Sequence, residues 1–465
     1  MTQPPVPSDS PVVGDSAVLA TFHDVEAELD RRWPESRIAP SLARIETLVD
    51  LLGSPQRSYP VVHIAGTNGK TSVTRMLDAL LSRLGLRVGS YTSPHLQRVT
   101  ERICIDGVPV TPERYVQAYR DVASYVALVD AGSPVPMSKF EVLTGMAFAA
   151  FADAPVDAAV VEVGLGGSWD ATNVADGAVA AITPIAVDHV EYLGGEITGI
   201  AAEKAGIIKP GSVAVLAAQP PEVAAVLTAR CTEVGVPAAR EGVEFGVLQR
   251  DVAVGGQRLR LQGLGGVYDE VFLPLHGAHQ AHNAVLALAA AEAFFGAGTS
   301  RSLDVEAVRE AFATVTVPGR LERVRTGPSV FLDSAHNPHG ARALARALRE
   351  EFAFRRRIVV VGMMRDKDAR GVMAELGPVA DEVVLTAGSS PRAMEVEQLA
   401  KVAEEFVEPG RLRVEPRLAD AITVAVTAAE QFGPDSLSPL GAGVVITGSV
   451  AMVGEARTLL GRNPP

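Results

Sequence analysis

The sequence predicts an α/β fold in two domains: an N-terminal domain with a mainly parallel sheet plus a small antiparallel sheet, and a Rossmann-like α/β C-terminal domain. Short apolar runs alternate with amphipathic helices along most of the chain, which is typical of parallel sheets covered by helices. The alternation is interrupted at Pro318 and Gly319 and then begins again. The chain has 465 residues, 47% of them hydrophobic and 21% charged, which suits two or three globular domains of about 150 residues each.

The N-terminal domain is expected over residues 17–317, after a disordered tail at residues 1–16. The tail is rich in Pro and Ser, and it lacks the basic start and the apolar stretch of a signal peptide. Residues 59–65 form a short apolar run that predicts the first buried strand. Residues 70–84 follow as a helix, because their apolar side chains recur at helical spacing.

Two more apolar runs, at residues 157–163 and 178–183, predict buried parallel strands. Between residues 245 and 275, glycine-punctuated β segments predict the small antiparallel sheet. The C-terminal domain is expected over residues 318–465, which is long enough for a core of its own. Its strands are predicted at residues 330–333, 358–361, 383–386 and 443–447. We expect a cleft between the two domains, where ligands commonly bind.

The composition argues against several classes of protein. Asp and Glu outnumber Lys and Arg by 55 to 42, the formal net charge is −13, and 5% of residues are aromatic, which disfavours nucleic-acid binding. Cys104 and Cys231 are too few for a disulfide framework or a four-cysteine zinc site. No apolar run approaches the roughly 18 residues of a membrane span, and residues 284–291 predict a buried helix instead. We expect a cytoplasmic protein with no membrane or nucleic-acid partner.

A glycine-rich loop carries the strongest functional signal. Residues 63–72 have the sequence HIAGTNGKTS and lie between the first predicted strand and its helix. Glycines let a backbone wrap closely around a phosphate, and a helix N-terminus directs N–H groups at it. A lysine at this position reaches terminal phosphates, and the next hydroxyl can join a magnesium shell. The predicted P-loop consists of Gly66, Thr67, Asn68, Gly69, Lys70, Thr71 and Ser72.

Polar residues also follow the next predicted strands. Glu162 ends the strand at residues 157–163, and a carboxylate buried in apolar surroundings needs a partner. Two partners explain this residue equally well. One is a magnesium ion at the C-terminal edge of a parallel sheet, and the other is an Arg or Lys in a salt bridge. His189 follows the strand at residues 178–183, but magnesium does not prefer neutral imidazole, so its chemistry alone assigns it no role.

Other polar residues have structural interpretations when taken one at a time. Lys204 has the pattern of a solvated helical lysine, and Ser93 that of a residue in a turn. Asn283 precedes a very apolar helix, where Asn commonly serves as an N-terminal cap. Asp333 ends the first strand of the C-terminal domain, with further polar residues directly after it. Polar residues where a strand ends and a helix begins indicate a binding edge.

Eleven stretches occur in one order along the chain: GTNGKTS (66–72), TSPHL (92–96), ERI (101–103), FEVLT (140–144), VEVGLGG (161–167), DATNV (170–174), DHVEYLG (188–194), EKAGIIK (203–209), PGRLE (318–322), DSAHNP (333–338) and ITGS (446–449). Any one could arise by chance, but the set is specific. It resembles the folylpolyglutamate synthase and dihydrofolate synthase family within the Mur ligase superfamily. The resemblance extends from residue 38 to residue 454, nearly the whole chain.

This resemblance implies roles that the residues alone left open. ATP would bind the P-loop and would contact Asn283, Arg320 and Asp333 across the cleft, with His336 nearby. Two magnesium sites are implied, and a monovalent cation is allowed. The metal ligands would be Ser93, Glu162, His189 and Lys204, the last of them as a carbamate. The residues implied in catalysis are Lys70, His189, Lys204, Asp333 and His336.

The resemblance also implies the reaction and the second substrate. The family adds L-glutamate to dihydropteroate and to folates at the expense of ATP, through an acyl phosphate. The implied pterin or folate residues are Pro40, Ser41, Leu42, Ser138, Lys139, Phe140, Glu141, Trp169, Asp170 and Ala171. The expected partners are these small-molecule substrates, and we expect a monomer.

Three alternatives remain. The enzyme could extend only polyglutamate chains, without acting on dihydropteroate. It could instead be a murein-peptide ligase acting on a UDP-muramoyl acceptor, as Thr71 after the P-loop lysine suggests, although the 65 residues before Gly66 are few for the additional domain of those enzymes. It could also be a regulatory GTPase, but the chain has no Asn-Lys pair with which to begin the guanine-recognising motif.

Overall fold

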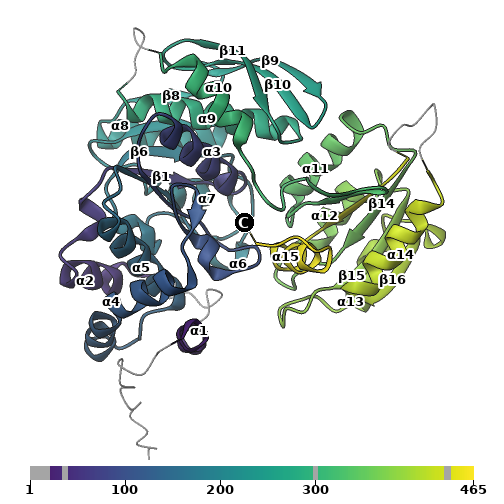
Figure 1. The fold of residues 1–465 in the computed structure, drawn as a ribbon, viewed down its shortest axis with the longest axis horizontal. Coiled ribbons are helices and arrows are strands. Elements are labelled where there is room, and N and C mark those ends of the chain that lie inside the picture. Colours follow the sequence, from purple (N-terminus) through teal and green to yellow (C-terminus); the bar gives the residue numbers. More distant parts are fainter. Residues whose placement is uncertain (1–20, 34–39, 297–301, 434–440, 465) are drawn as a thin grey trace, which may run out of the picture.

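The computed structural model describes residues 21–33, 40–296, 302–433 and 441–464 and arranges them as two α/β domains beside each other (Figure 1). The tail predicted at residues 1–16 lies outside the described residues. The predicted α/β fold, with its two kinds of sheet and its second domain, is confirmed. None of the helices in the described part of the chain has the length and apolarity needed to cross a bilayer.

The N-terminal domain is built on an eight-stranded sheet. Its strands, from edge to edge, are β4 (Val108–Pro109), β3 (Ile103–Ile105), β2 (Val88–Tyr91), β5 (Ala158–Glu162), β1 (Val61–Ala65), β6 (Gly177–Ile182), β7 (Val213–Leu216) and β8 (Ala238–Arg240). The six strands from β2 to β8 are parallel, and β3 and β4 continue the sheet in antiparallel fashion. The C-terminal ends of the parallel strands therefore meet at one edge, where the P-loop follows β1.

Helices cover both faces of this sheet because its central strands are apolar on both sides. The helices are α1 (Phe22–Arg31), α2 (Ala43–Leu51), α3 (Lys70–Arg83), α4 (Pro112–Gly132), α5 (Lys139–Asp153), α6 (Val190–Leu193), α7 (Ile197–Ala205), α8 (Pro221–Val234), α9 (Ala278–Phe294) and α10 (Val305–Thr314), with 3-10 turns η1 (Pro55–Arg57), η2 (Val99–Arg102) and η3 (Ala171–Val174). Val62 and Ile64 of β1 face α3 and α9, whereas Val61 faces α5. The buried helix predicted around residues 284–291 is α9.

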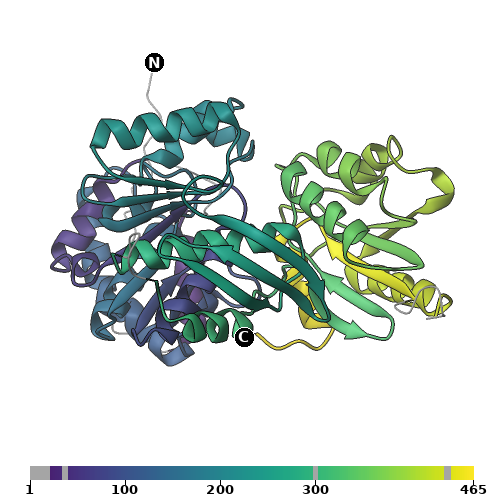
Figure 2. The same ribbon diagram turned by 90° about the horizontal axis from the view of Figure 1, so that it is seen from above.

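The small antiparallel sheet lies where the glycine-punctuated β segments predicted it. Its strands are β9 (Gly246–Ala253), β10 (Gly256–Gln262) and β11 (Val267–Leu273), in the order β11–β10–β9. Figure 2 shows this sheet reaching along the N-terminal domain towards the C-terminal domain. Arg250 of β9 forms an ion pair with Glu351 at the end of α11 (Pro338–Glu350), so the small sheet joins the two domains.

The C-terminal domain has a six-stranded sheet between two layers of helices. Its strands, in spatial order, are β12 (Glu322–Thr326), β13 (Ser329–Leu332), β17 (Ala442–Thr447), β14 (Arg356–Val361), β15 (Glu382–Ala387) and β16 (Leu412–Arg417), and only β12 is antiparallel to its neighbour. Helices α11, α12 (Ala369–Leu376) and α13 (Val396–Ala403) cover one face, and α14 (Leu418–Glu430) and α15 (Val450–Leu459) cover the other, with a 3-10 turn η4 (Pro409–Arg411) before β16. The predicted boundary near residue 318 falls between α10 and β12.

Candidate active site between the two domains

Two cavities meet where the P-loop edge of the N-terminal sheet faces the C-terminal domain. The larger has a volume of about 520 Å³ and is lined by both domains, including the P-loop and the stretch at residues 333–336. The smaller, of about 250 Å³, is lined mainly by the N-terminal domain. Both cavities are lined by Ser93, Pro94, Gly164, Leu165 and His189. A molecule in one cavity can therefore approach a molecule in the other across this shared wall.

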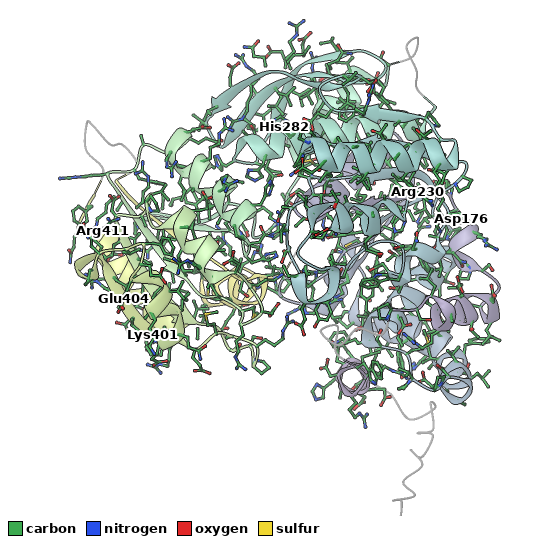
Figure 3. The ribbon with its side chains drawn as sticks, turned by 180° about the vertical axis from the view of Figure 1, so that it is seen from behind. Asp176, Arg230, His282, Lys401, Glu404 and Arg411 are labelled. Atoms are coloured by element: carbon green, nitrogen blue, oxygen red, sulfur yellow. The ribbon has the colours of Figure 1, made fainter. Side chains whose placement is uncertain are left out.

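The larger cavity collects most of the predicted site. It is lined by all seven P-loop residues and by Ser93, Glu162, His189, Lys204, Asn283, Arg320, Asp333 and His336. These residues come from segments far apart in the sequence, and the sheet edge and the domain gap bring them together. Figure 3 labels His282, another lining residue of this cavity, whose Nδ1 contacts Glu241.

The P-loop depends on two glycines that no other residue can replace without strain. Gly66 has φ 144° and Gly69 has φ 93°, both in the region that favours glycine. A Cβ on Gly66 would overlap the Thr183 side chain, and a Cβ on Gly69 would lie 2.6 Å from Asn283 Oδ1. The loop therefore passes close to β6 and α9, which hold its backbone around the cavity.

At the base of the loop, Glu162 is buried and Lys70 is half-buried. Lys70 Nζ donates to the carbonyl oxygens of Gly66 and Thr67 at 3.2 and 3.4 Å. Thr71 Oγ1 lies 3.1 Å from both carboxylate oxygens of Glu162 and donates to this group. Burial lowers the pKa of Lys70, and burial raises the pKa of Glu162 to about 7 against the opposing effect of Lys70. Both charges lie beside the cavity, where a phosphate and a cation would compensate them.

The donor atoms at this point suit magnesium better than a transition metal. Within the described residues, no three His, Cys, Asp or Glu side chains cluster as a metal-binding group. The oxygens present are the Glu162 carboxylate and the Thr71 and Ser93 hydroxyls, all on the wall of the larger cavity. Magnesium commonly binds one or two protein oxygens together with phosphate oxygens and waters. The residues therefore fit a magnesium ion that is shared with a bound nucleotide.

Lys204 is buried, which corrects its interpretation as a solvated lysine. Lys204 lies in the last turn of α7, is 4% exposed and lines the larger cavity. The loop at Gly167 packs so closely on α7 that a Cβ there would lie 2.8 Å from Lys204 Cα. Burial lowers the pKa of Lys204 to about 7, so the amine is partly neutral at neutral pH.

Asn283 is not the helix cap that its local pattern suggests. It lies within α9, whose N-terminal cap is Gly277. Its Nδ2 donates to Gln280 Oε1 at 3.0 Å, and the side chain lies against Gly69 of the P-loop. The cap interpretation is wrong because the helix begins at Ala278, six residues before the apolar run at residues 284–291.

Asp188 connects the two domains. Its carboxylate accepts hydrogen bonds from Lys367 Nζ at 2.7 Å and Asn337 Nδ2 at 2.8 Å, and His336 Nε2 lies 3.5 Å away. Burial opposes ionisation of Asp188, but the hydrogen bond from His336 and the charge of Lys367 outweigh it and lower the pKa. Lys367 Nζ also lies 3.2 Å from His189 Nε2, and burial lowers the pKa of His189 to about 4, so this imidazole is neutral at neutral pH.

Asp333 is held within the C-terminal domain, and the P-loop adds a further contact between the domains. Asp333 accepts hydrogen bonds from the backbone N–H groups of Leu321 and Ala335, both at 2.9 Å, and burial raises its pKa although Arg320 opposes the shift. Asn68 Nδ2 lies 3.3 Å from Asn337 Oδ1 and 3.0 Å from His339 Nδ1. The P-loop of one domain therefore touches the start of α11 in the other.

The smaller cavity contains most of the predicted pterin residues. It is lined by Pro40, Ser41, Ser138, Phe140, Glu141, Trp169, Asp170 and Ala171. Ser138 and Glu141 form a capping box at the start of α5, and Glu141 also pairs with Arg44 at 2.9 Å. Leu42 and Lys139 lie beside the cavity instead: Leu42 packs on the apolar core, and Lys139 Nζ pairs with Asp30 at 2.7 Å.

Several residues at the site were not anticipated. Lys367 and Arg392 come from loops after β14 and β15, where polar residues following a strand are a usable signal. Arg44, Tyr192 and Trp33 carry no local signal, because each reaches the smaller cavity through tertiary packing. Their recruitment therefore could not be predicted from sequence spacing.

Comparison with known proteins supports the same assignment. The Mur ligase middle domain matches residues 138–291, and the Mur ligase glutamate ligase domain matches residues 319–449. A dihydrofolate synthase/folylpolyglutamate synthase of Mycobacterium tuberculosis is 58% identical over 463 residues, covering 96% of this chain and 95% of that protein. One of Bacillus subtilis is 32% identical over 379 residues, covering 80% and 88%.

Solved structures agree with the sequence comparison. A Mycobacterium tuberculosis folylpolyglutamate synthase complexed with ADP superposes with a TM-score of 0.91 at 56% identity, covering 97% of this chain and all (100%) of that one. Escherichia coli FolC in complex with DHPP and ADP superposes with a TM-score of 0.82 at 29% identity, covering 95% and 98%. With its P-loop, its two-domain cleft and these relatives, the chain belongs to the dihydrofolate synthase/folylpolyglutamate synthase family of the Mur ligases.

Proposed function

We propose that this chain is an ATP-dependent ligase that adds L-glutamate to dihydropteroate and to folates. The observation that carries the proposal is the shared wall at Ser93, Pro94, Gly164, Leu165 and His189. It brings a cavity with a P-loop against a second cavity whose lining includes the aromatic side chains of Trp33, Phe140 and Trp169. The named relatives and the ADP complexes of similar chains support the same assignment.

The first step joins the acceptor carboxylate to phosphate. A carboxylate oxygen of the acceptor, held in the smaller cavity, attacks the γ-phosphorus of ATP in the larger cavity, and ADP leaves. An acyl phosphate results. Lys70 and the backbone N–H groups of the P-loop would hold the phosphates in line with the attacking oxygen. Magnesium bound by Glu162, Thr71 and Ser93 would supply neutralisation of the phosphate charge.

The second step forms the amide. The glutamate amine, in its neutral form, attacks the acyl carbon, inorganic phosphate leaves, and the nitrogen loses a proton. His336 and Asp333 of the C-terminal domain line the larger cavity, and in the proposed reaction they would lie beside the incoming amine. Closure through Asp188 would also exclude water, which would otherwise hydrolyse the acyl phosphate.

Finer features belong to the same proposal. A second magnesium ion would need an additional anionic ligand, and a carbamate on the buried Lys204 would provide one. The neutral amine that burial favours is the form that reacts with carbon dioxide. We also propose that the protein is a monomer and lies in the cytoplasm.

The test is mass spectrometry of the products made by purified protein with ATP, magnesium and L-glutamate. Parallel reactions hold dihydropteroate, tetrahydrofolate or a UDP-muramoyl peptide as acceptor. The proposal predicts one added glutamyl unit on both pterin acceptors and none on the muramoyl peptide. Addition only to tetrahydrofolate would reduce the function to chain extension, and addition only to the muramoyl peptide would refute it.

A further inference from the structure

A cation from the C-terminal domain lines the cavity that the N-terminal domain provides for the acceptor. Arg392 lies in the loop between β15 and α13, yet it lines the smaller cavity together with Trp33 and Tyr192. Its side chain is 52% exposed, and its Nη2 lies 2.9 Å from Asp366 Oδ1. A guanidinium has five N–H donors, so this ion pair leaves donors for a further acceptor.

The loop that carries Arg392 is fixed in place by its neighbour. The backbone N–H of Arg365 donates to the Arg392 carbonyl oxygen at 3.0 Å, and Arg365 Nε and Nη2 donate to the carbonyls of Ala393 and Pro391 at 2.9 and 2.8 Å. The Met394 N–H donates to the Met363 carbonyl oxygen at 2.8 Å. The guanidinium therefore projects from a backbone that is already positioned, which reduces the entropy lost when it binds an anion.

The other charged groups of this cavity are matched within the protein. Arg44 and Glu141 form a 2.9 Å ion pair, with side chains 12% and 6% exposed. The Asp170 carboxylate accepts hydrogen bonds from the backbone N–H groups of Leu165 and Thr172, both at 2.9 Å. Among the charged side chains lining the cavity, Arg392 is the cation with an exposed guanidinium.

Arg392 lines the same cavity as His189 of the shared wall. Its partner Asp366 is adjacent in the chain to Lys367, whose Nζ lies 3.2 Å from His189 Nε2. His189 belongs to the wall shared by the two cavities. A carboxylate held by Arg392 would therefore lie in the same cavity as the wall across which the acceptor meets ATP.

The two acceptors differ in charge at the end that reacts. Dihydropteroate carries one carboxylate, and the reaction consumes it. The glutamyl residue of a folate carries two, of which one is activated and the other stays ionised throughout. We propose that Arg392 binds this non-reacting carboxylate and so serves the addition of glutamate to folates but not to dihydropteroate. Guanidinium and carboxylate fit each other through two parallel hydrogen bonds. This inference rests on the proposed function.

The experiment compares wild type, Arg392→Ala and Arg392→Lys on three acceptors. These are dihydropteroate, tetrahydrofolate, and a tetrahydrofolate whose non-reacting carboxylate is replaced by a carboxamide. For Arg392→Ala we expect kcat/KM on tetrahydrofolate to fall about 10- to 100-fold, mainly through KM, and kcat/KM on dihydropteroate to change less than about 3-fold. Arg392→Lys should restore part of the loss, because an ammonium makes one contact in place of two.

The carboxamide acceptor isolates the pair of charges. The kcat/KM of wild type on the carboxamide should equal the kcat/KM of Arg392→Ala on tetrahydrofolate. For Arg392→Ala itself, the carboxamide and tetrahydrofolate should have the same kcat/KM. Arg417→Ala is the matched control, since Arg417 is an exposed cation of the same domain that pairs with Asp420 and lines neither cavity. It should leave both reactions unchanged.

The outcomes separate this inference from the function on which it rests. The role of Arg392 would be overturned if Arg392→Ala lowered kcat/KM equally on dihydropteroate and tetrahydrofolate, or lowered it on neither. It would also be overturned if Arg392→Ala had a lower kcat/KM on the carboxamide than on tetrahydrofolate. Wild type that adds glutamate to neither acceptor would instead refute the proposed function, whatever the variants do.

Discussion

Three ionisable side chains line one cavity: Glu162 and Lys204 are buried there, and Lys70 is half-buried. Burial lowers the pKa of both lysines and raises that of the glutamate, so the neutral form of each group is favoured. Shifts of this kind are typical of sites that bind charged ligands, since the ligand supplies the missing compensation. The P-loop lysine and two of the implied metal ligands are thus groups whose charged forms burial disfavours in the free protein.

Lys70→Ala should therefore abolish catalysis rather than folding. Lys70 contacts two carbonyl oxygens of its own loop, and in the proposed reaction it would hold the phosphate as charge moves. We expect kcat to fall by about 100-fold or more, with the melting temperature close to that of wild type, as measured by ADP release and thermal unfolding. Lys401→Ala is the control, because Lys401 lies on the outer flank of the C-terminal domain (Figure 3). Near-wild-type turnover by Lys70→Ala would contradict the assigned role.

His63 makes the acid side of the stability profile predictable. It is buried in β1, its Nε2 lies 2.9 Å from Thr172 Oγ1, and burial lowers its pKa to about 3. Between about pH 3 and pH 6.5 the unfolded state binds the extra proton, so the free energy of unfolding rises with pH and then levels off above about pH 6.5. The expected slope from this residue is about 1.4 kcal/mol per pH unit.

Urea denaturation of wild type and His63→Gln at several pH values measures this slope. The glutamine keeps a polar group near Thr172 but does not titrate. The difference in unfolding free energy between the two proteins should change by about 1.4 kcal/mol per pH unit on the acid side and stay constant above about pH 6.5. A difference that is independent of pH over the whole range would show that His63 does not titrate as described.

At the scale of elements, most strands and the loops between them were predictable from the sequence. β1, β5, β13, β14 and β17 are continuous apolar runs, and their ends fall within about two residues of the predicted ones, as expected for buried parallel strands. The strands β12 and β16 were not predicted, because both lie at sheet edges with much of their surface exposed and charged.

The burial of Lys204 and the place of Asn283 could not be predicted for a related reason. Lys204 is covered by the loop at Gly167, and Asn283 lies against Gly69, in each case a contact between segments remote in the sequence. Local periodicity describes one element and carries no information about what packs on it. The family resemblance supplied both roles where the periodicity had indicated other ones.

Helix α15 offers a test of how closely the domains must approach. A Cβ on Gly454 in this helix would overlap the backbone carbonyl oxygen of Leu96, and backbone cannot move aside as a side chain can. Leu96 follows the Ser93–Pro94 segment of the shared wall. We expect Gly454→Ala to cost about 1–3 kcal/mol of stability and to lower kcat/KM for the acceptor.

Thermal unfolding and steady-state kinetics measure the two effects of Gly454→Ala. The matched control is Gly410→Ala, since Gly410 lies in a 3-10 turn, has no positive φ, and has no neighbouring atom within 4 Å of the place that a Cβ would take. A Gly454→Ala protein as stable and as active as Gly410→Ala would mean that α15 does not press on the shared wall.

At the scale of the whole molecule, one carboxylate of the N-terminal domain contacts three side chains of the C-terminal domain at the site. Asp188 belongs to the N-terminal domain, whereas Lys367, Asn337 and His336 belong to the C-terminal domain. The Lys367 side chain is only 9% exposed, so its charge depends on Asp188 for compensation. The Asp188–Lys367 pair therefore both joins the domains and compensates the charge of Lys367.

Asp188→Ala should both destabilise and open the molecule. It leaves Lys367 buried without its carboxylate, which typically costs about 3–5 kcal/mol unless the domains separate to hydrate the amine. We expect a larger radius of gyration by small-angle X-ray scattering and a loss of ligase activity. Asp420→Ala, which breaks an exposed pair within one domain, should change neither. An unchanged radius together with full activity would contradict the role of Asp188 in closure.

The path of one oxygen atom distinguishes the proposed reaction from its alternatives. If the acceptor carboxylate in the smaller cavity attacks ATP in the larger one across their shared wall, an oxygen of the acceptor must leave with the phosphate. Dihydropteroate labelled with ¹⁸O in both carboxylate oxygens is turned over with ATP and L-glutamate, and the phosphate is analysed by mass spectrometry. We expect one ¹⁸O in each inorganic phosphate released and one kept in the new amide. Unlabelled phosphate alongside newly formed amide would contradict this mechanism.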